Sequence, residues 1–115
     1  NIVLVGSSNA MEIANELISA NGKKNIVNMV NQLTFAQTAS VIKDSQVLLC
    51  CDGGLMHAAN AVGTPIIPLF ARLTPEMQLT HSVVAFSNFD ELDVKKISVE
   101  SILTQYDNAY KFLNI

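Results

Sequence analysis

Apolar residues along this chain fall into short continuous runs, separated by stretches in which they recur at helical spacing. The runs predict five strands, at residues 2–5, 25–30, 46–51, 66–70 and 82–86. The stretches between them predict helices at residues 9–20, 34–44, 55–62 and 99–113, the last being the most clearly amphipathic. Residues 71–80 are expected to form a loop and residues 88–96 a polar connection.

The ends of the predicted helices carry residues that usually start and stop helices. Ser8 and Thr34 are the expected N-caps, and Gly22 and Gly63 are the expected stops. Pro68 lies inside a predicted strand. Because proline has no amide hydrogen to donate, it indicates a sheet edge or an irregularity there.

Strands and helices alternate as they do when parallel strands are joined by crossover helices. A near-continuous apolar strand such as residues 46–51 is typical of a strand buried on both faces. We therefore predict an α/β fold, a three-layer Rossmann-like open parallel sheet of about five strands with helices on both faces.

Composition sets limits on partners and location. The 115 residues are enough for one domain and too few for two. A net charge of −3 without a stripe of Lys and Arg argues against a nucleic-acid partner. No apolar run reaches the roughly 20 residues that span a bilayer. The adjacent cysteines, Cys50 and Cys51, should point to opposite faces of a strand, which favours a reducing cytoplasm over a disulfide.

The most distinctive chemistry lies in the stretch CDGGLMHAANAVGTP, residues 51–65, where Asp52-Gly53-Gly54 follows a strand and opens a helix. Ligands of open parallel sheets bind at such places, where the first helical amides lack partners and the helix dipole favours an anion. Glycines let a phosphate approach those amides closely. The same residues would also make a plain tight turn capped by Asp52, whose unpaired carboxylate would repel a phosphate. From the residues alone, both interpretations stay open.

Other candidate groups have simpler interpretations. A lone His57 on an alanine-rich helix is typical of a packed, hydrogen-bonded histidine. Cys51 would be a reactive thiol only at the sheet rim near the helix dipole. The Cys and His spacings match no zinc site, and neither GxGxxG nor GxxxxGK[ST] occurs, so no metal and no cofactor are expected.

Residues 46–70 resemble the motif of glycosyltransferase family 9, the ADP-heptose:lipopolysaccharide heptosyltransferases. In that family an apolar strand is followed by Asp-[Ser/Thr]-Gly-x-x-His, then Ala-Ala and Gly-x-Pro. The corresponding residues here are Asp52-Gly53-Gly54-Leu55-Met56-His57, Ala58-Ala59 and Gly63-Thr64-Pro65. The resemblance covers most of the chain and weakens after Thr74.

The resemblance implies a GT-B enzyme, in which two Rossmann-like domains face each other across a cleft, and this chain would be its C-terminal, donor-binding half. The amides of Gly53, Gly54 and Leu55 would hold the diphosphate of a nucleotide-sugar donor, an ADP-sugar. Asp52 and His57 would lie beside it. The residues implied near adenine and ribose are Gln32, Leu33 and Thr34. With the resemblance, phosphate becomes the favoured interpretation of the glycine turn.

The chain also departs from the family pattern. Gly53 stands where Ser or Thr is usual, and Gln32 where Lys is common. Residues 71–75 follow the family's Gly-Pro-Thr-x-Pro only loosely, which leaves Arg72 without an assigned role.

The resemblance further implies parts that precede Asn1. The acidic general base belongs to an N-terminal acceptor domain, so this piece is expected to be inactive alone. Its parent would be a glycosyltransferase of lipopolysaccharide or a related glycan, cytoplasmic and peripheral to the inner membrane. The family's donor domain also begins with one more strand and helix. Without them, residues 47–51 could pair with residues 2–5 in the order 2-1-3-4-5; otherwise another copy or the parent chain fills the gap.

Two other classes of protein share this type of fold. A flavodoxin-like or receiver-like module would bind its ligand without transferase chemistry, but a receiver needs clustered acids where this chain has Gly6-Ser7-Ser8. A sugar-nucleotide epimerase of GT-B architecture is the third alternative, and a preference for UDP over ADP would indicate it.

Overall fold

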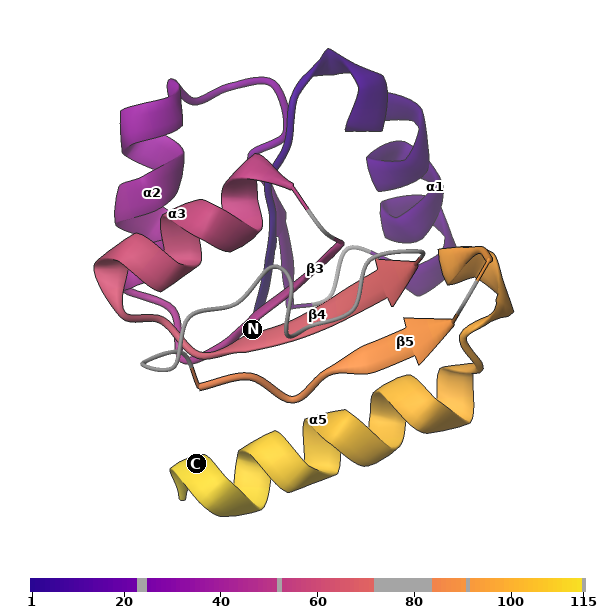
Figure 1. The fold of residues 1–115 in the computed structure, drawn as a ribbon. Coiled ribbons are helices and arrows are strands. Elements are labelled where there is room, and N and C mark those ends of the chain that lie inside the picture. The colour runs from indigo at the N-terminus through magenta and orange to yellow at the C-terminus, as the bar shows by residue number, and fades with distance from the viewer. Residues whose placement is uncertain (23–24, 52, 72–83, 91, 115) are drawn as a thin grey trace. The chain divides into compact units, whose positions relative to one another are not determined.

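A computed structural model describes residues 1–22, 25–51, 53–71, 84–90 and 92–114 of the chain (Figure 1). The chain divides into two compact units, Asn1–Thr38 and Ala39–Ile115. Each unit pairs parallel strands with helices, so the predicted α/β class is confirmed.

The first unit holds a two-stranded parallel sheet of β1 (Ile2–Leu4) and β2 (Ile26–Asn28), joined through the 3-10 turn η1 (Ser8–Ala10) and helix α1 (Met11–Asn21). Gly6 is required where the chain leaves β1, because its φ is 153° and an added Cβ would lie 3.1 Å from the Ala10 Cβ. The prediction that Ser8 caps the helix was wrong, since Ser8 lies within η1 and the α1 cap position is Ala10. The predicted stop at Gly22 is confirmed by its left-handed φ of 65°.

Helix α2 (Phe35–Lys43) begins at the cap that the sequence predicts. The Gln37 amide donates to Thr34 Oγ1 at 3.1 Å, and the Thr34 amide donates back to Gln37 Oε1 at 2.8 Å. Two amides that the helix itself leaves without partners are thereby satisfied, as in a capping box.

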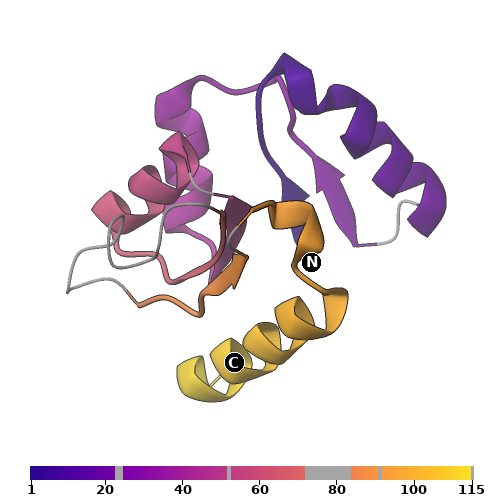
Figure 2. The same ribbon diagram turned by 45° about the vertical axis from the view of Figure 1, so that its right-hand side comes forward.

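The second unit holds a three-stranded parallel sheet in the order β3-β4-β5. Its elements after α2 are β3 (Leu48–Cys51), α3 (Gly54–Val62), β4 (Ile66–Ala71), β5 (Asn88–Asp90), the 3-10 turn η2 (Val94–Lys96) and α5 (Val99–Leu113). Two helices cover opposite faces of this sheet, α3 on one and α5 on the other (Figures 1 and 2). The predicted layering therefore holds within this unit.

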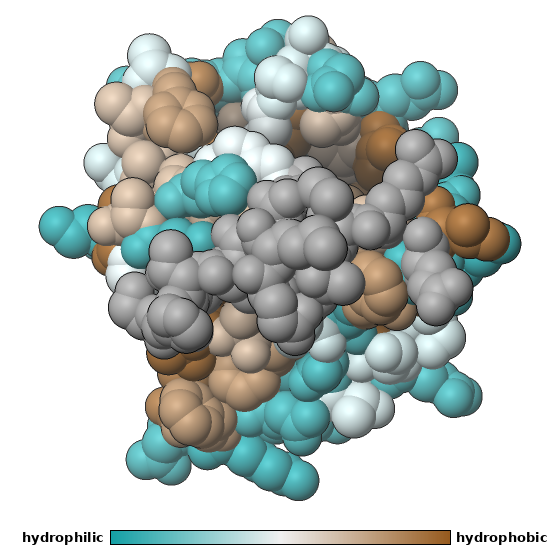
Figure 3. Space-filling model, in the orientation of Figure 1, coloured by the Kyte–Doolittle hydropathy of each residue, from teal (hydrophilic) through white to brown (hydrophobic). Residues whose placement is uncertain are grey.

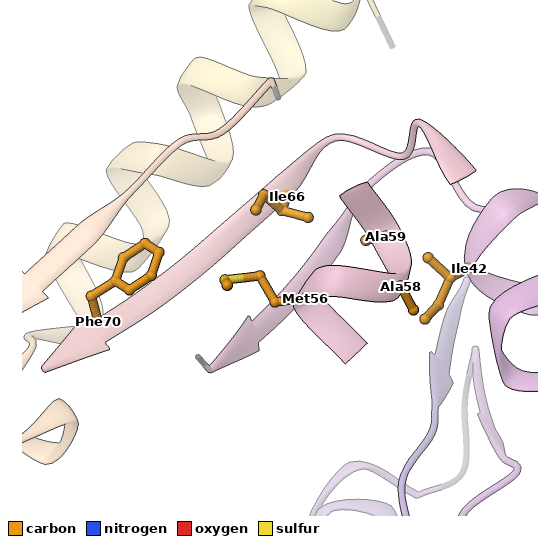
Figure 4. Packing of buried hydrophobic residues seen from close by; sticks show 6 residues of the cluster. All are labelled: Ile42, Met56, Ala58, Ala59, Ile66 and Phe70. Carbon is orange, nitrogen blue, oxygen red and sulfur yellow. The ribbon is translucent and has the colours of Figure 1, made fainter. Parts of the chain in front are cut away.

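The main core lies between α3 and the sheet. The cluster joins Met56, Ala58 and Ala59 of α3 to Ile66 and Phe70 of β4 and to Ile42 of α2, with Met56 on the β4 side and Ala58 beside Ile42 (Figure 4). Four of these side chains are completely buried, and burial of a large apolar side chain stabilises the fold by about 1.5–3 kcal/mol. The core thus fixes α3 on β4 and, with it, the position of the helix N-terminus.

Helix α5 is held to the other face of the sheet by hydrogen bonds near β5. Ser101 Oγ donates to Asn88 Oδ1 at 2.7 Å, and Gln105 Nε2 donates to the Ser87 carbonyl at 2.7 Å. The rings of Phe86 and Phe112 meet edge to face with centroids 5.7 Å apart. One flank of α5 is therefore turned toward β5.

The last strand lies later in the chain than its pattern predicts. Residues 84–86 do run beside Ile66, whose amide donates to the Val84 carbonyl at 3.0 Å, but the assigned strand is Asn88–Asp90. The prediction of a polar connection was therefore wrong for residues 88–90, which form the strand. Residues 82–83, and all of the predicted loop 71–80 except Ala71 of β4, lie outside the described residues.

Pro68 lies in the central strand β4, so a sheet edge was the wrong interpretation and an irregularity the right one. The amide of Ile66 points toward the β5 side, and strand amides alternate, so the nitrogen of Pro68 faces that side too. The pairing of β4 on this side is interrupted between the bridge at Ala85 and the start of β5 at Asn88. Because the Pro68 nitrogen faces away from β3, its lack of an amide hydrogen removes no hydrogen bond between β4 and β3.

The strands form two sheets rather than one. Among the described residues β1 pairs with β2 alone, and β3 pairs with β4 alone. The order 2-1-3-4-5, in which residues 47–51 close against residues 2–5, is therefore wrong for this chain. The alternative, that another copy or the parent chain fills the gap, stays a prediction.

Candidate functional site

The candidate site is the turn between β3 and α3. Strand β3 ends at Cys51, and α3 begins at Gly54 with Gly53 at its cap position. The first helical hydrogen bond runs from the His57 amide to the Gly53 carbonyl at 3.3 Å. Asp52, which the sequence places in this turn, lies outside the described residues. The turn stands at the carboxyl end of a parallel strand, where α/β folds bind ligands.

The backbone of this turn offers donors that the described protein does not use. No hydrogen bond among the described residues has the amide of Gly53, Gly54 or Leu55 as its donor, and none of the described side chains caps α3. Gly53 and Gly54 are exposed and Leu55 is half-buried. These amides, with the positive end of the helix dipole, can donate to an anion.

The two glycines are not required by the fold of the described chain. Gly53 has φ 161° and ψ −168°, an extended conformation that any residue adopts. A Cβ added to Gly53 or Gly54 would meet nothing within 4 Å. Among the described residues, the space next to these two positions is thus open, and a Cβ there meets no clash. Because glycine has no side chain, a ligand can approach the backbone of this turn closely.

Helix α3 is anchored at its far end. It stops at Gly63, whose φ of 81° is left-handed, and the buried Thr64 Oγ1 then donates to the Ile42 carbonyl at 2.8 Å. With Met56 and Ala59 fully buried, the helix cannot rotate without breaking the core. Its N-terminal amides are therefore held in place before any ligand binds.

His57 and Cys51 flank the turn as accessible side chains. His57 is exposed on the first turn of α3, so the interpretation of a packed histidine was wrong. Cys51 is exposed at the end of β3, whereas Cys50 is half-buried. Arg72 lies outside the described residues.

The residues expected near adenine and ribose belong to the first unit, whereas Gly53 to His57 belong to the second. Gln32 is exposed and its Nε2 donates to the Asn28 carbonyl at 3.1 Å. Leu33 is half-buried, and the Thr34 hydroxyl oxygen accepts the Gln37 amide at the start of α2. Their association with the glycine turn is not tested by the structure and stays a prediction.

Sequence reasoning did not single out Asp90, at the carboxyl end of β5. Amide hydrogen bonds from Asp93 and Leu92, both 3.0 Å from Asp90 Oδ2, hold the pKa of this carboxyl below its ordinary value. The local signal is recognisable: an Asp side chain often accepts hydrogen bonds from the backbone amides two and three residues later. Because these bonds shape the loop into η2, we assign Asp90 to the structure of this loop.

Neither a metal site nor a membrane span is found in the described part of the chain. No three of its His, Cys, Asp and Glu side chains gather in a group that could hold a metal ion. Its helices are all too short or too polar to cross a bilayer.

Comparison with known proteins identifies the family. The model of glycosyltransferase family 9 (heptosyltransferase) matches residues 1–106, and the chain belongs to this family. The family that the residues around the glycine turn predict is thereby confirmed. None of the curated proteins matches the chain.

Two solved structures share the fold. One is ADP-heptose lipopolysaccharide heptosyltransferase II of E. coli, with a TM-score of 0.80 and 20% identity over 100% of this chain and 38% of that chain. The other is the family 9 glycosyltransferase of Veillonella parvula DSM 2008, with a TM-score of 0.74 and 18% identity over 96% of this chain and 36% of that chain. This chain therefore spans little more than a third of either one.

Proposed function

We propose that this chain is the donor-binding part of a family 9 glycosyltransferase that transfers a sugar from a nucleotide-sugar to lipopolysaccharide or a related glycan. The donor we favour is ADP-heptose. The family match and the name of the E. coli neighbour support this class of reaction. The single observation that carries the donor site is the glycine turn before α3, whose amides donate to none of the described residues.

The diphosphate is the part of the donor that fits this turn. The amides of Gly53, Gly54 and Leu55 donate to its oxygens, and the dipole of α3 favours its charge. When the sugar leaves, negative charge grows on the same diphosphate, so these donors stabilise the leaving group in the transition state. His57, exposed on the first turn, is close enough in sequence to orient the phosphates, with Asp52 in the same turn.

The remaining parts of the donor and the reaction involve residues farther away. In this proposal Gln32, Leu33 and Thr34 lie near the adenine and the ribose. The base that activates the acceptor comes from an N-terminal domain of the parent protein, and inversion at the sugar proceeds by direct displacement. We accordingly expect the isolated chain to bind a donor without turning it over, and the parent to work in the cytoplasm.

Thermal unfolding with nucleotides tests the donor site. ADP should raise the melting temperature of the chain, because a ligand at ten times its Kd stabilises the folded state by about 1.4 kcal/mol. Gly53→Val should abolish this rise, since its side chain fills the space above the amides while the extended backbone accepts it. Ala61→Val, at an exposed position near the other end of α3, is the matched control and should keep the rise.

Two results would contradict the diphosphate site itself. One is no rise at millimolar ADP. The other is an equal rise in Gly53→Val and the unmodified chain, which would place the nucleotide elsewhere. A larger rise in melting temperature with UDP than with ADP would contradict the proposed recognition of adenine and favour a uridine donor.

A further inference from the structure

Asn21 and Gly22 form the one Asn-Gly pair in the sequence, and they stand where α1 ends. In such a pair the backbone nitrogen of the glycine can attack Cγ, the side-chain amide carbon of the asparagine. Glycine has no side chain to hinder this approach. Asparagine is for this reason one of the residues that chemical change removes from proteins most readily.

Both residues of the pair are open to water. Asn21 and Gly22 are exposed, as are Ser19 and Ala20 before them in the last turn of α1. Hydrophilic side chains gather on the outer side of α1 (Figure 3, upper right). A reaction that consumes water therefore meets no barrier of access at this end of the helix.

The helix nevertheless holds both reacting groups. Asn21 Nδ2, the nitrogen that would leave, donates to the Leu17 carbonyl at 2.7 Å. The Gly22 amide, whose nitrogen would attack, donates to the Ile18 carbonyl. Each hydrogen bond fixes one reactant to the preceding turn of α1, so neither is free to move toward the other.

The helical backbone also keeps the two groups apart. Asn21 is the last residue of α1 and so has helical dihedral angles. A five-membered ring closes only when the Asn21 Cβ and the Gly22 nitrogen are nearly eclipsed about the Cα–C bond, and in an α-helix they are turned roughly 80° apart. The reaction therefore requires the last turn of α1 to open, and helix ends open more readily than helix centres.

We propose that Asn21 is a site of spontaneous deamidation, and that opening of the last turn of α1 controls its rate. In the open form the Gly22 nitrogen bonds to Asn21 Cγ. The bond from Cγ to Nδ2 breaks, and Nδ2 leaves as ammonia with the proton that the Gly22 nitrogen gives up. One water molecule then opens the cyclic imide at either carbonyl, which yields aspartate or isoaspartate. The reaction needs no oxidant, reductant or cofactor, and it does not depend on the donor site.

The product weakens the element that protected the asparagine. Either product carries a carboxylate at the C-terminal end of α1, where the helix dipole disfavours negative charge. Isoaspartate also routes the main chain through its side chain, so the Gly22 amide can no longer take its helical place opposite the Ile18 carbonyl. The modification is therefore irreversible and leaves α1 shorter in an aged molecule.

Peptide mapping by mass spectrometry tests the site in the protein produced from the whole gene. After incubation in slightly alkaline buffer, Asn21 should gain the mass that replaces NH2 by OH, and enzymatic carboxyl methylation should detect isoaspartate there. Asn25 is the internal control, because it is also exposed but precedes the branched Ile26. Deamidation of Asn21 that is no faster than that of Asn25 would overturn the proposed site.

The same measurement in urea tests control by the helix. The folded protein should deamidate at Asn21 about 10-fold more slowly than the urea-unfolded protein, as expected for a site that reacts only after local opening. Equal rates in the folded and the unfolded protein would show that α1 gives no protection, and would overturn this control.

A pair of matched variants separates local opening from global unfolding. Ala20→Gly, at an exposed position in the last turn of α1, should raise the rate in the folded protein about five-fold, because glycine disfavours the helix. It should leave the rate in urea unchanged. Ala61→Gly, at an exposed position of α3, should not change the rate at Asn21. No acceleration in Ala20→Gly, or equal acceleration in both variants, would overturn control by the end of α1. The nucleotide experiment involves other residues, so the two proposals can fail independently.

Discussion

At the residue scale, the glycines of the second unit serve two different purposes. Gly63 has a left-handed φ of 81° and ends α3, a conformation that other residues adopt only with strain. Gly53 is extended, and an added Cβ would meet nothing. The first glycine serves the fold of this chain, and the second leaves room above a helix N-terminus.

Alanine substitutions should separate these purposes. Gly63→Ala is expected to lower the free energy of unfolding by about 1–2 kcal/mol, because alanine is strained at positive φ. Gly53→Ala should leave it within about 0.5 kcal/mol, or raise it slightly by restricting the unfolded chain. Urea unfolding of both variants measures the difference. A loss of similar size at both positions would show that Gly53 is needed for folding.

A second residue-scale prediction concerns the buried hydroxyl of Thr64. Its bond to the Ile42 carbonyl ties the end of α2 to the start of β4. Thr64→Val keeps the shape and removes the donor, so we expect a loss of about 1 kcal/mol. The loss stays small because the Ile42 carbonyl also accepts the Ser45 amide at 3.0 Å. Chemical denaturation should confirm this value, and Thr104→Val on exposed α5 serves as the control with little change expected. A Thr64→Val loss no larger than that of the control would contradict this role.

At the scale of elements, local signals in the sequence predict most of the structure. The strands at residues 2–5, 46–51 and 66–70, the Thr34 cap and the Gly22 and Gly63 stops are found where the pattern places them. The failures are at β5, whose sequence Asn-Phe-Asp has little apolar character, and at Ser8, which a 3-10 turn takes up. In α5 the apolar face is wider than the face the sheet buries, because Val99, Leu103 and Tyr106 are 70%, 56% and 49% exposed. The pairing of β5 with β4 and the partial burial of α5 depend on tertiary contacts, which the pattern along a sequence does not contain.

The loop after β5 supplies an element-scale prediction about pH. The amides of Asp93 and Leu92 stabilise the charged form of Asp90 and lower its pKa from the ordinary value of 3.8. A carboxyl whose pKa is lower in the folded than in the unfolded chain stabilises the fold at pH values above its unfolded pKa. This stabilisation is lost as the pH falls through its folded pKa. Asp90→Asn should therefore lose less stability than the unmodified chain when pH falls from 5 to about 2. Urea unfolding across this range measures it, and identical pH profiles would show that the loop does not depend on the charge.

For the candidate site, the sequence predicts the position of the glycine turn and the family, because both rest on a local motif. The exposure of His57 and the open space above Gly53 follow instead from how α3 packs on β4. The family resemblance, rather than the residues alone, supplied Gln32, Leu33 and Thr34. These residues lie in a different unit from the turn, so no local pattern could relate them to it.

At the scale of the whole molecule, the two units differ in how much core they contain. In the unit Asn1–Thr38, Ala14 and Val30 are the buried hydrophobic residues among those described, and Val3 and Val27 are paired across the strands yet 39% and 48% exposed. A two-stranded sheet with so little burial is marginally stable at best in water. The second unit has the larger core and should set the global stability of the chain.

Hydrogen exchange of residues 1–115 tests this difference. Amides of the first unit, such as Met29 bonded to the Leu4 carbonyl, should exchange through local opening, whereas amides of β4 should require global unfolding. Ile67→Ala removes a buried side chain and should cost about 2–5 kcal/mol, accelerating exchange in β4 but not at Met29. Val27→Ala, at a half-exposed position, is the control and should leave β4 unchanged. If Ile67→Ala accelerated Met29 and β4 together, the chain would unfold as one cooperative body, because independent units cannot transmit the loss of a buried side chain from one to the other.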